Sequence, residues 1–269
     1  MKTGRFSVTR SLIVLWTVAI VVFLYIPIAS VVLASFSRKR YFSFPVTQWT
    51  TKWYAKAMES LSVRDLIETS LQVALLVTVF SVVLAFFGSL AFARYDWKGR
   101  KLYQKIILLP IFFPQAVLGL ALLLWFSAIG VITSWQTAVF AHMVWIVPIV
   151  TLIMSIQVYS FDPALEEAAY DLGATRWQVL REITLPILSP GILSGAIFAF
   201  LLSWGNFPLS LFTTGADQTI PEWRYAKMVS GYTPMVPTLG SLTVGSAVIV
   251  LVLAYLGYFI IRRRRVPNN

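Results

Sequence analysis

The feature that most constrains this chain is a series of long segments without Asp, Glu, Lys or Arg. The longest segment runs from Ile106 to Phe161, which is 56 residues. Such segments are typical of membrane-spanning helices, because each helix needs about 20 apolar residues and one charged side chain in hydrocarbon costs about 3 kcal/mol or more. The composition agrees, with 58% hydrophobic and 12% charged residues. The sequence therefore predicts an all-α integral membrane protein.

Six membrane-spanning helices are predicted within a single domain of residues 1–269. Their approximate limits are 11–36, 69–93, 106–127, 136–159, 191–212 and 238–261. Pro110, Pro114 and Gly119 predict that the third of these helices is broken or kinked, because proline removes a helix hydrogen bond. Pro27 is expected to kink the first helix, and Pro148 to disturb the fourth, for the same reason.

The segment between the first two spans, residues 38–68, is rich in aromatic residues. Trp49, Trp53, Ala57 and Leu61 recur in it at helical spacing. Indole side chains favour the boundary between lipid and water. The spacing therefore predicts an amphipathic helix that lies at the membrane surface.

The basic residues favour an orientation with both termini in the cytoplasm. Lys and Arg number 14 on the side that would be cytoplasmic and 8 on the other side. An excess of these residues marks the cytoplasmic side of membrane proteins, and six spans place both termini on one side. The bases lie at the ends of apolar segments and do not form one basic face. The net charge of +11 therefore does not indicate nucleic-acid binding.

A charged loop at residues 162–186 predicts two short helices joined by an elbow. Asp162 is a suitable N-cap, Pro163 suits the first helical position, and Gly173 is a suitable C-terminal stop. One face of this first helix is apolar and, at its centre, small, with Leu165, Ala168, Ala169 and Leu172. A stripe of this kind permits close approach of another backbone. It indicates a helix that docks into a groove, and the alternative is a solvated amphipathic loop.

The second helix of the loop has its own signals. Thr175 and Gln178 are spaced as a capping box, and Pro186 is expected to end or kink the helix.

At this point the residues resemble a known family. The spacing of Glu167, Ala168, Ala169, Gly173, Ile183, Leu185 and Pro186 matches the EAA motif of permease subunits of bacterial ABC importers. Trp53 with Tyr54, and Ser70, Leu71 and Ala74, are also similar to the second permease of spermidine/putrescine-type systems. The similarity covers essentially the whole chain.

The resemblance implies a type I importer permease in the bacterial inner membrane, with a cytoplasmic coupling helix. It further implies a second homologous permease subunit, two copies of a cytoplasmic ATPase that holds ATP and Mg²⁺, and a periplasmic binding protein that delivers a small solute. The coupling residues that it implies are Leu165, Glu166, Glu167, Ala168, Ala169, Asp171, Leu172 and Gly173.

The chain departs from the polyamine pattern near residue 206. Polyamine permeases carry carboxylates after the serine that corresponds to Ser203, whereas this chain has Asn206. A related solute, such as an opine, an amino-acid derivative or a phosphonate, is therefore the alternative. Three residues beside predicted helix breaks are candidates to line the path, and their alternative role is to bridge helices or fill an interface. They are Gln115, Trp204 and Asn206.

Other function classes lack their residues in this sequence. There is no Gly-Lys-Ser/Thr phosphate loop, so ATP is expected on another chain and no cofactor on this one. All 11 acidic residues lie outside the charge-free segments, which disfavours a stand-alone secondary transporter or channel. With no cysteine and one histidine, His142, no catalytic or metal site is expected. His142 is expected to be packed and hydrogen-bonded, and the alternative is a contact with the solute. A structural subunit of another complex remains a further alternative.

Overall fold

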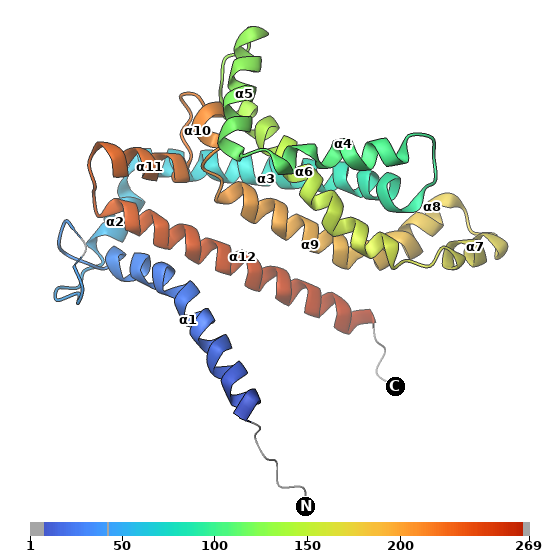
Figure 1. Ribbon diagram of the computed structural model, residues 1–269, viewed down its shortest axis with the longest axis horizontal. Helices are drawn as coiled ribbons and strands as arrows, with labels where there is room; N and C mark the ends of the chain where they lie inside the picture. The colour runs from blue at the N-terminus through green and yellow to red at the C-terminus, as the bar shows by residue number, and fades with distance from the viewer. Residues whose placement is uncertain (1–7, 42, 266–269) are drawn as a thin grey trace, which may run out of the picture. The chain divides into compact units, whose positions relative to one another are not determined.

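The computed structural model describes residues 8–41 and 43–265, and this part of the chain is almost entirely helical (Figure 1). Five helical stretches in it are long and apolar enough to cross a membrane: Arg10–Ser35, Leu61–Arg94, Trp135–Tyr159, Arg176–Trp204 and Met235–Phe259. A sixth candidate is the bent pair Arg100–Phe112 and Gln115–Ala128. The two predicted cytoplasmic termini lie outside the described residues.

The chain divides into two compact units. The first, unit 1, comprises Met1–Leu61 and Arg224–Gly245, and the second, unit 2, comprises Ser62–Trp223 and Ser246–Asn269. Unit 1 contains α1 (Val8–Ser35), α2 (Lys52–Glu59), most of α11 (Ile220–Ser230) and the start of α12 (Met235–Arg265). Unit 2 contains the other helices and the rest of α12.

Unit 1 is held together by hydroxyl and ring contacts at the ends of its helices. The Tyr54 hydroxyl on α2 hydrogen-bonds with Ser35 Oγ at the end of α1 (2.6 Å) and with Ser241 Oγ on α12 (3.0 Å). Pro27 lies inside α1, and the helix continues on both sides of it. One aromatic side chain, Tyr54, therefore joins three helices of this unit.

The limits predicted for the amphipathic helix, residues 49–61, are wrong. Trp49 lies before the helix and forms an isolated antiparallel bridge with Ser37, and Leu61 is the first residue of the next helix. The helix in this segment is α2 alone, eight residues long. The physical reason is that Ser60 has extended backbone angles (φ −79°, ψ 118°), which end α2 before Leu61.

Unit 2 is built around three long helices. They are α3 (Leu61–Ser89), α6 (Trp135–Tyr159) and α9 (Leu185–Trp204), which bury aliphatic side chains such as Val77, Ile146 and Ala199 against one another. The α6 and α9 helices run side by side (Figure 1). A Cβ atom on Gly191 or Gly195 would lie 2.9 Å from α6 atoms. These two glycines, four residues apart, therefore permit the close approach.

The predicted break in the third span divides it into two helices. The α4 helix (Arg100–Phe112) ends before Phe113, and α5 (Gln115–Ala128) begins after Pro114, with a bend of 102° between them. Phe113 is extended (φ −82°, ψ 136°), as expected of a residue that precedes proline. Pro114 therefore makes the break, whereas Pro110 lies inside α4 and Gly119 inside α5.

Two helices of unit 2 differ in extent from the predicted spans. The helical stretch through α3 begins eight residues before residue 69 and ends in a π-helix, η1 (Leu90–Arg94). The stretch through α9 begins at Arg176, with α8 (Arg176–Val179) and a second π-helix, η2 (Leu180–Thr184), and it ends at Trp204 instead of residue 212. Beyond Trp204 the chain turns into the short helix α10 (Ser210–Thr213).

Pro186 does not end the helix, contrary to the expectation from the sequence, because the helical stretch runs from Arg176 to Trp204. The wide turn of η2 brings the Leu185 N–H to the Leu180 carbonyl, five residues earlier. Pro186 is the second residue of α9 and follows this wide turn directly.

Candidate functional site

The first helix of the charged loop, α7 (Ala164–Asp171), begins one residue later than predicted, with Pro163 at its N-cap position and Asp162 just before it. Asp162 Oδ1 accepts a hydrogen bond from the Ala164 N–H at 3.0 Å. Pro163 lies directly before the first regular helical residue, one position earlier than predicted. A carboxylate that accepts from the first turn of a helix compensates one of its unpaired N–H groups and interacts favourably with the helix dipole.

The predicted elbow is confirmed at Gly173. Its φ is +83°, the left-handed region that favours glycine. The Gly173 N–H donates to the Tyr170 carbonyl (2.9 Å) and the Ala174 N–H to the Ala169 carbonyl (3.0 Å), which together form a Schellman motif. Local backbone hydrogen bonds therefore fix the direction of the chain between α7 and the next helix.

The capping box of the second helix is also confirmed. The Gln178 N–H donates to Thr175 Oγ1 (3.3 Å), and the Thr175 N–H donates to Gln178 Oε1 (2.8 Å). This box starts α8, so the loop has the predicted order of helix, glycine elbow and helix.

The apolar stripe of α7 is largely exposed in the part of the chain that the structure describes. None of the α7 residues is buried, Leu165 is 49% exposed, and Leu172, just after the helix, is 89% exposed. Trp177 on α8 is 65% exposed. Exposed aliphatic and aromatic groups at such density are typical of a protein interaction surface. Ala168, Glu167 and Asp171 are exposed beside the stripe, and Ala169 is partly buried.

Glu166 lies differently from its neighbours, because its carboxylate faces its own chain. Its Oε2 atom pairs with Arg94 Nη2 at 2.7 Å, and its Oε1 atom accepts a hydrogen bond from Thr184 Oγ1. Sequence reasoning missed both partners. They lie 72 and 18 residues from Glu166, and no local spacing signals such contacts.

Two of the three candidate path residues meet at the breaks in the helices. The Asn206 amide donates to Gln115 Oε1 at 3.4 Å, and Asn206 Oδ1 accepts from the Leu209 N–H at 3.1 Å. Asn206 is 5% exposed and Gln115 is partly buried. Trp204 is also buried and stacks on Phe200, with ring centroids 5.8 Å apart. Within this chain the two amides have the geometry of a helix bridge.

His142 is packed and hydrogen-bonded, as predicted. Its two ring nitrogens lie 2.9 Å from Ser203 Oγ and 3.1 Å from Ser210 Oγ, and the side chain is fully buried. The ring therefore connects α6 with the end of α9 and the start of α10. The sequence signal that was missed is the pair Ser203 and Ser210, which lie on either side of the break between α9 and α10.

Two acidic residues after α10 serve as hydrogen-bond acceptors. Asp217 Oδ2 accepts from the Trp135 N–H at the start of α6 (3.1 Å), and Glu222 Oε2 accepts from Thr214 Oγ1 (2.6 Å) and from the Thr219 N–H (3.4 Å). Burial raises the pKa of Glu222, whereas its two hydrogen bonds act in the opposite direction. No group of three His, Asp or Glu residues suited to hold a metal ion occurs among residues 8–41 and 43–265.

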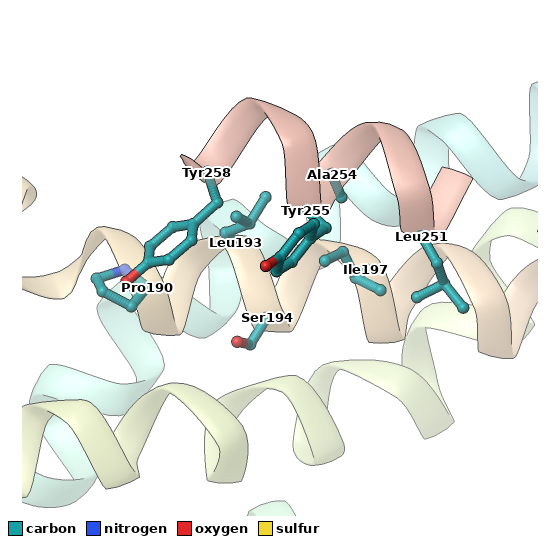
Figure 2. Close-up of a pocket in the computed structure, with 8 residues that line it drawn as sticks. All are labelled: Pro190, Leu193, Ser194, Ile197, Leu251, Ala254, Tyr255 and Tyr258. Carbon is teal, nitrogen blue, oxygen red and sulfur yellow. The ribbon is translucent and has the colours of Figure 1, made fainter. Parts of the chain in front are cut away.

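A groove of about 430 Å³ lies between α9 and α12 within unit 2 (Figure 2). The rings of Tyr255 and Tyr258 extend from α12 towards α9, where Ser194 supplies another hydroxyl (Figure 2). The remaining lining is hydrocarbon, from Pro190, Leu193, Ile197, Leu251 and Ala254. The groove contains no charged group that would bind a charged solute.

Comparisons with known proteins agree with this architecture. Residues 83–265 match the family model described as binding-protein-dependent transport system inner membrane component. The chain is 28% identical over 239 residues to the spermidine/putrescine transport system permease protein PotC of Escherichia coli K12, covering 88% of this chain and 90% of that protein. It is also 28% identical to the putrescine transport system permease protein PotI of the same strain, covering 87% and 85%.

A solved structure has the same fold at lower sequence identity. A bacterial ABC transporter involved in the import of the acidic polysaccharide alginate matches with a TM-score of 0.70 and 19% identity, covering 97% of each chain. The prediction of an all-α integral membrane fold is thereby confirmed.

Proposed function

Because this chain belongs to the family of binding-protein-dependent transport system inner membrane components, we propose that it forms half of a membrane path for a small organic cation of the polyamine class. Its role as the permease subunit of an ABC importer follows from the family and confirms the sequence prediction. The observation that supports the solute class is the similarity to PotC and PotI along most of the chain.

The proposed partners are a second homologous permease, two copies of a cytoplasmic ATPase that carries ATP and Mg²⁺, and a periplasmic binding protein. The family description itself includes dependence on a binding protein. The exposed apolar stripe of α7 supports ATPase docking, because Leu165 and Leu172 are exposed beside Glu167, Ala168 and Ala169 of the EAA motif. Hydrolysis of ATP is therefore assigned to the partner, and this chain is proposed to act as a single permease domain with both termini in the cytoplasm.

The path residues are proposed to recognise the solute through neutral dipoles. Gln115 and Asn206 offer amide oxygens, which can accept hydrogen bonds from an ammonium group but supply no full negative charge. A carboxylate at position 206 would attract a polycation more strongly. Charge neutralisation is therefore proposed to come from the second permease or from the binding protein.

A second candidate solute class is favoured by the same departure. Asn206 in place of a carboxylate suits an opine, an amino-acid derivative or a phosphonate, each of which carries negative groups. The stand-alone secondary transporter is the less favoured alternative, because the charge-free segments lack acidic residues.

Isolation of the complex through an affinity tag on this chain tests the proposal. We expect an ATPase and a second permease to co-purify, and we expect uptake of radiolabelled putrescine or spermidine into proteoliposomes only with ATP and the binding protein. Uptake without any ATPase would contradict the importer assignment. Uptake of a labelled opine or phosphonate, with none of either polyamine, would replace the solute class and retain the permease role.

A further inference from the structure

The most tightly connected residue of α7 is Glu166, which is bound to two other parts of unit 2. We propose that Arg94 and Thr184 are positioning residues that hold Glu166, so that α7 moves together with the ends of two membrane-spanning helices. The inference rests on the proposed function of α7 as the helix that docks on the ATPase. It adds the route by which a displacement of α7 reaches the membrane-spanning helices.

Each oxygen of the Glu166 carboxylate has its own partner. Oε2 pairs with Arg94 Nη2 at 2.7 Å, and Oε1 accepts from Thr184 Oγ1. Arg94 is the last residue of the stretch that continues α3, and Thr184 is the last residue before α9. One carboxylate on α7 therefore bridges the ends of two helices that belong to the core of unit 2.

The ion pair is shielded from water, which distinguishes it from a surface salt bridge. The side chains of Arg94 and Glu166 are 13% and 16% exposed. The Arg94 guanidinium also lies over the ring of Phe161, 4.6 Å from its centroid, and Phe161 is buried. Exposed ion pairs contribute little to stability, but removing one partner of a shielded pair leaves the other charge uncompensated. Removing either Arg94 or Glu166 is therefore expected to destabilise the contact between α7 and the rest of unit 2.

Both partners of Glu166 end a π-helix. Arg94 is the last residue of η1 and Thr184 the last residue of η2, and these are the two π-helices in the part of the chain that the structure describes. Well under 1% of residues in proteins lie in π-helices, which occur frequently at functional sites. The Glu166 carboxylate therefore contacts each of these two helical stretches at its π-helical turn.

The carboxylates of Glu166 and Glu167, which are neighbours on α7, have different surroundings. Glu167 is exposed and remains available to a partner protein, whereas Glu166 is engaged within its own chain. Glu182 in η2 is also exposed and belongs to neither contact, which makes it a matched control for the loss of one carboxylate.

The test compares Glu166→Gln, Arg94→Gln, Arg94→Lys and the reversal Arg94→Glu with Glu166→Arg, using Glu182→Gln as the control. Cysteines replacing Lys98 and Ala164, both exposed and outside the apolar stripe of α7, carry spin labels, which the native chain allows because it has no cysteine. Electron paramagnetic resonance then measures the distance distribution between the two labels in the purified complex. Hydrolysis of ATP stimulated by the binding protein, and the amount of ATPase that co-purifies, are measured on the same variants.

We expect Glu166→Gln and Arg94→Gln to retain the ATPase, to broaden the distance distribution and to lose about tenfold in stimulated hydrolysis, within the usual range of coupling between sites. Arg94→Lys and the reversal should recover a narrow distribution and part of the activity. A Glu166→Gln variant that matches Glu182→Gln in both measurements would overturn the proposal.

If the single variants do not assemble, the reversal decides, because recovery of assembly requires the pair and a lack of recovery overturns it. Absence of any ATPase from the wild-type preparation would contradict the proposed function instead, while the spin labels would still report on the ion pair.

Discussion

Asn206 has two hydrogen-bonding roles that a substitution can separate. Its Oδ1 atom accepts from the Leu209 N–H and closes the turn before α10, whereas its Nδ2 atom donates to Gln115 on α5. The first role needs only an acceptor, and the second needs a donor. An aspartate keeps the first role and adds a negative charge, and a leucine removes both roles.

We expect Asn206→Asp to assemble with its partners and to raise the uptake of putrescine relative to Asn206→Leu. Asn206→Leu should lower the melting temperature, because a buried Leu209 N–H without a partner costs about 1–3 kcal/mol. The measurement is uptake into proteoliposomes together with a thermal melt of the detergent-solubilised complex. Equal uptake by wild type and both variants would remove Asn206 from the path.

Glu222 provides a prediction about pH. Burial raises its pKa in the folded protein, so the folded state binds this proton more tightly than the unfolded state does. The stability that this group contributes is therefore present at low pH and is lost as the pH rises through the raised pKa. Glu222→Gln keeps an oxygen for Thr214 and Thr219 and cannot ionise.

We expect the melting temperature of Glu222→Gln, relative to wild type, to increase as the pH is raised from about 5 to about 8. Glu59→Gln, which removes an exposed carboxylate from α2, serves as the control and should show no such trend. A constant difference between Glu222→Gln and wild type across this range would contradict the prediction.

At the scale of helices and loops, the sequence predicted what local chemistry determines. Asp162, Gly173 and the pair of Thr175 with Gln178 act through neighbouring backbone groups, so their spacing was sufficient to place α7 and α8. Pro114 breaks the third span through its effect on the residue before it. The elbow at Gly173 and the break at Pro114 thus follow from residue types alone.

Features that depend on distant residues could not be predicted in this way. The π-helix η2 admits Pro186 into a continuous helix, and no residue type in it announces a wide turn. The partners of Glu166 come from two other segments, and the serines around His142 lie more than 60 residues away. Tertiary packing decides each of these contacts, so the connections within the site were missed although its main helix was identified.

The elbow after α7 is expected to control how that helix is presented. Valine at Gly173 would have to adopt a φ of +83°, which costs about 1–3 kcal/mol, although no atom lies within 4 Å of the added Cβ. Gly130, between α5 and α6, has a similar φ of +74° and equally open surroundings. Gly130→Val therefore applies a comparable backbone strain far from α7 in sequence.

We expect Gly173→Val to reduce the amount of ATPase that co-purifies and to abolish stimulated hydrolysis, whereas Gly130→Val should lower the melting temperature by a similar amount and retain both. Quantitative co-purification and phosphate release measure the difference. Normal coupling in Gly173→Val would show that the direction of α7 does not depend on the elbow.

At the scale of the whole molecule, the proposed orientation rests on the distribution of charge. The asymmetry of 14 to 8 basic residues is moderate, because the segment before α2, together with α2, carries Arg38, Lys39, Arg40, Lys52 and Lys56. Three of these residues have local partners, and the first is Lys39, whose Nζ donates to Ser43 Oγ (3.5 Å). Arg40 Nε donates to the Tyr232 carbonyl (3.4 Å), and Lys52 Nζ lies 4.4 Å from the centroid of the Trp53 ring.

Cysteine labelling tests the orientation directly, because the native chain has no cysteine and gives no background. Met58 on α2 is 70% exposed, and Lys98 lies exposed between η1 and α4. If the termini are cytoplasmic, Met58→Cys should react with a membrane-impermeant maleimide on intact spheroplasts, and Lys98→Cys should react only after the membrane is permeabilised. The opposite pattern would invert the topology. Because α7 would then face the periplasm, where no ATPase is available, that result would also remove its proposed docking role.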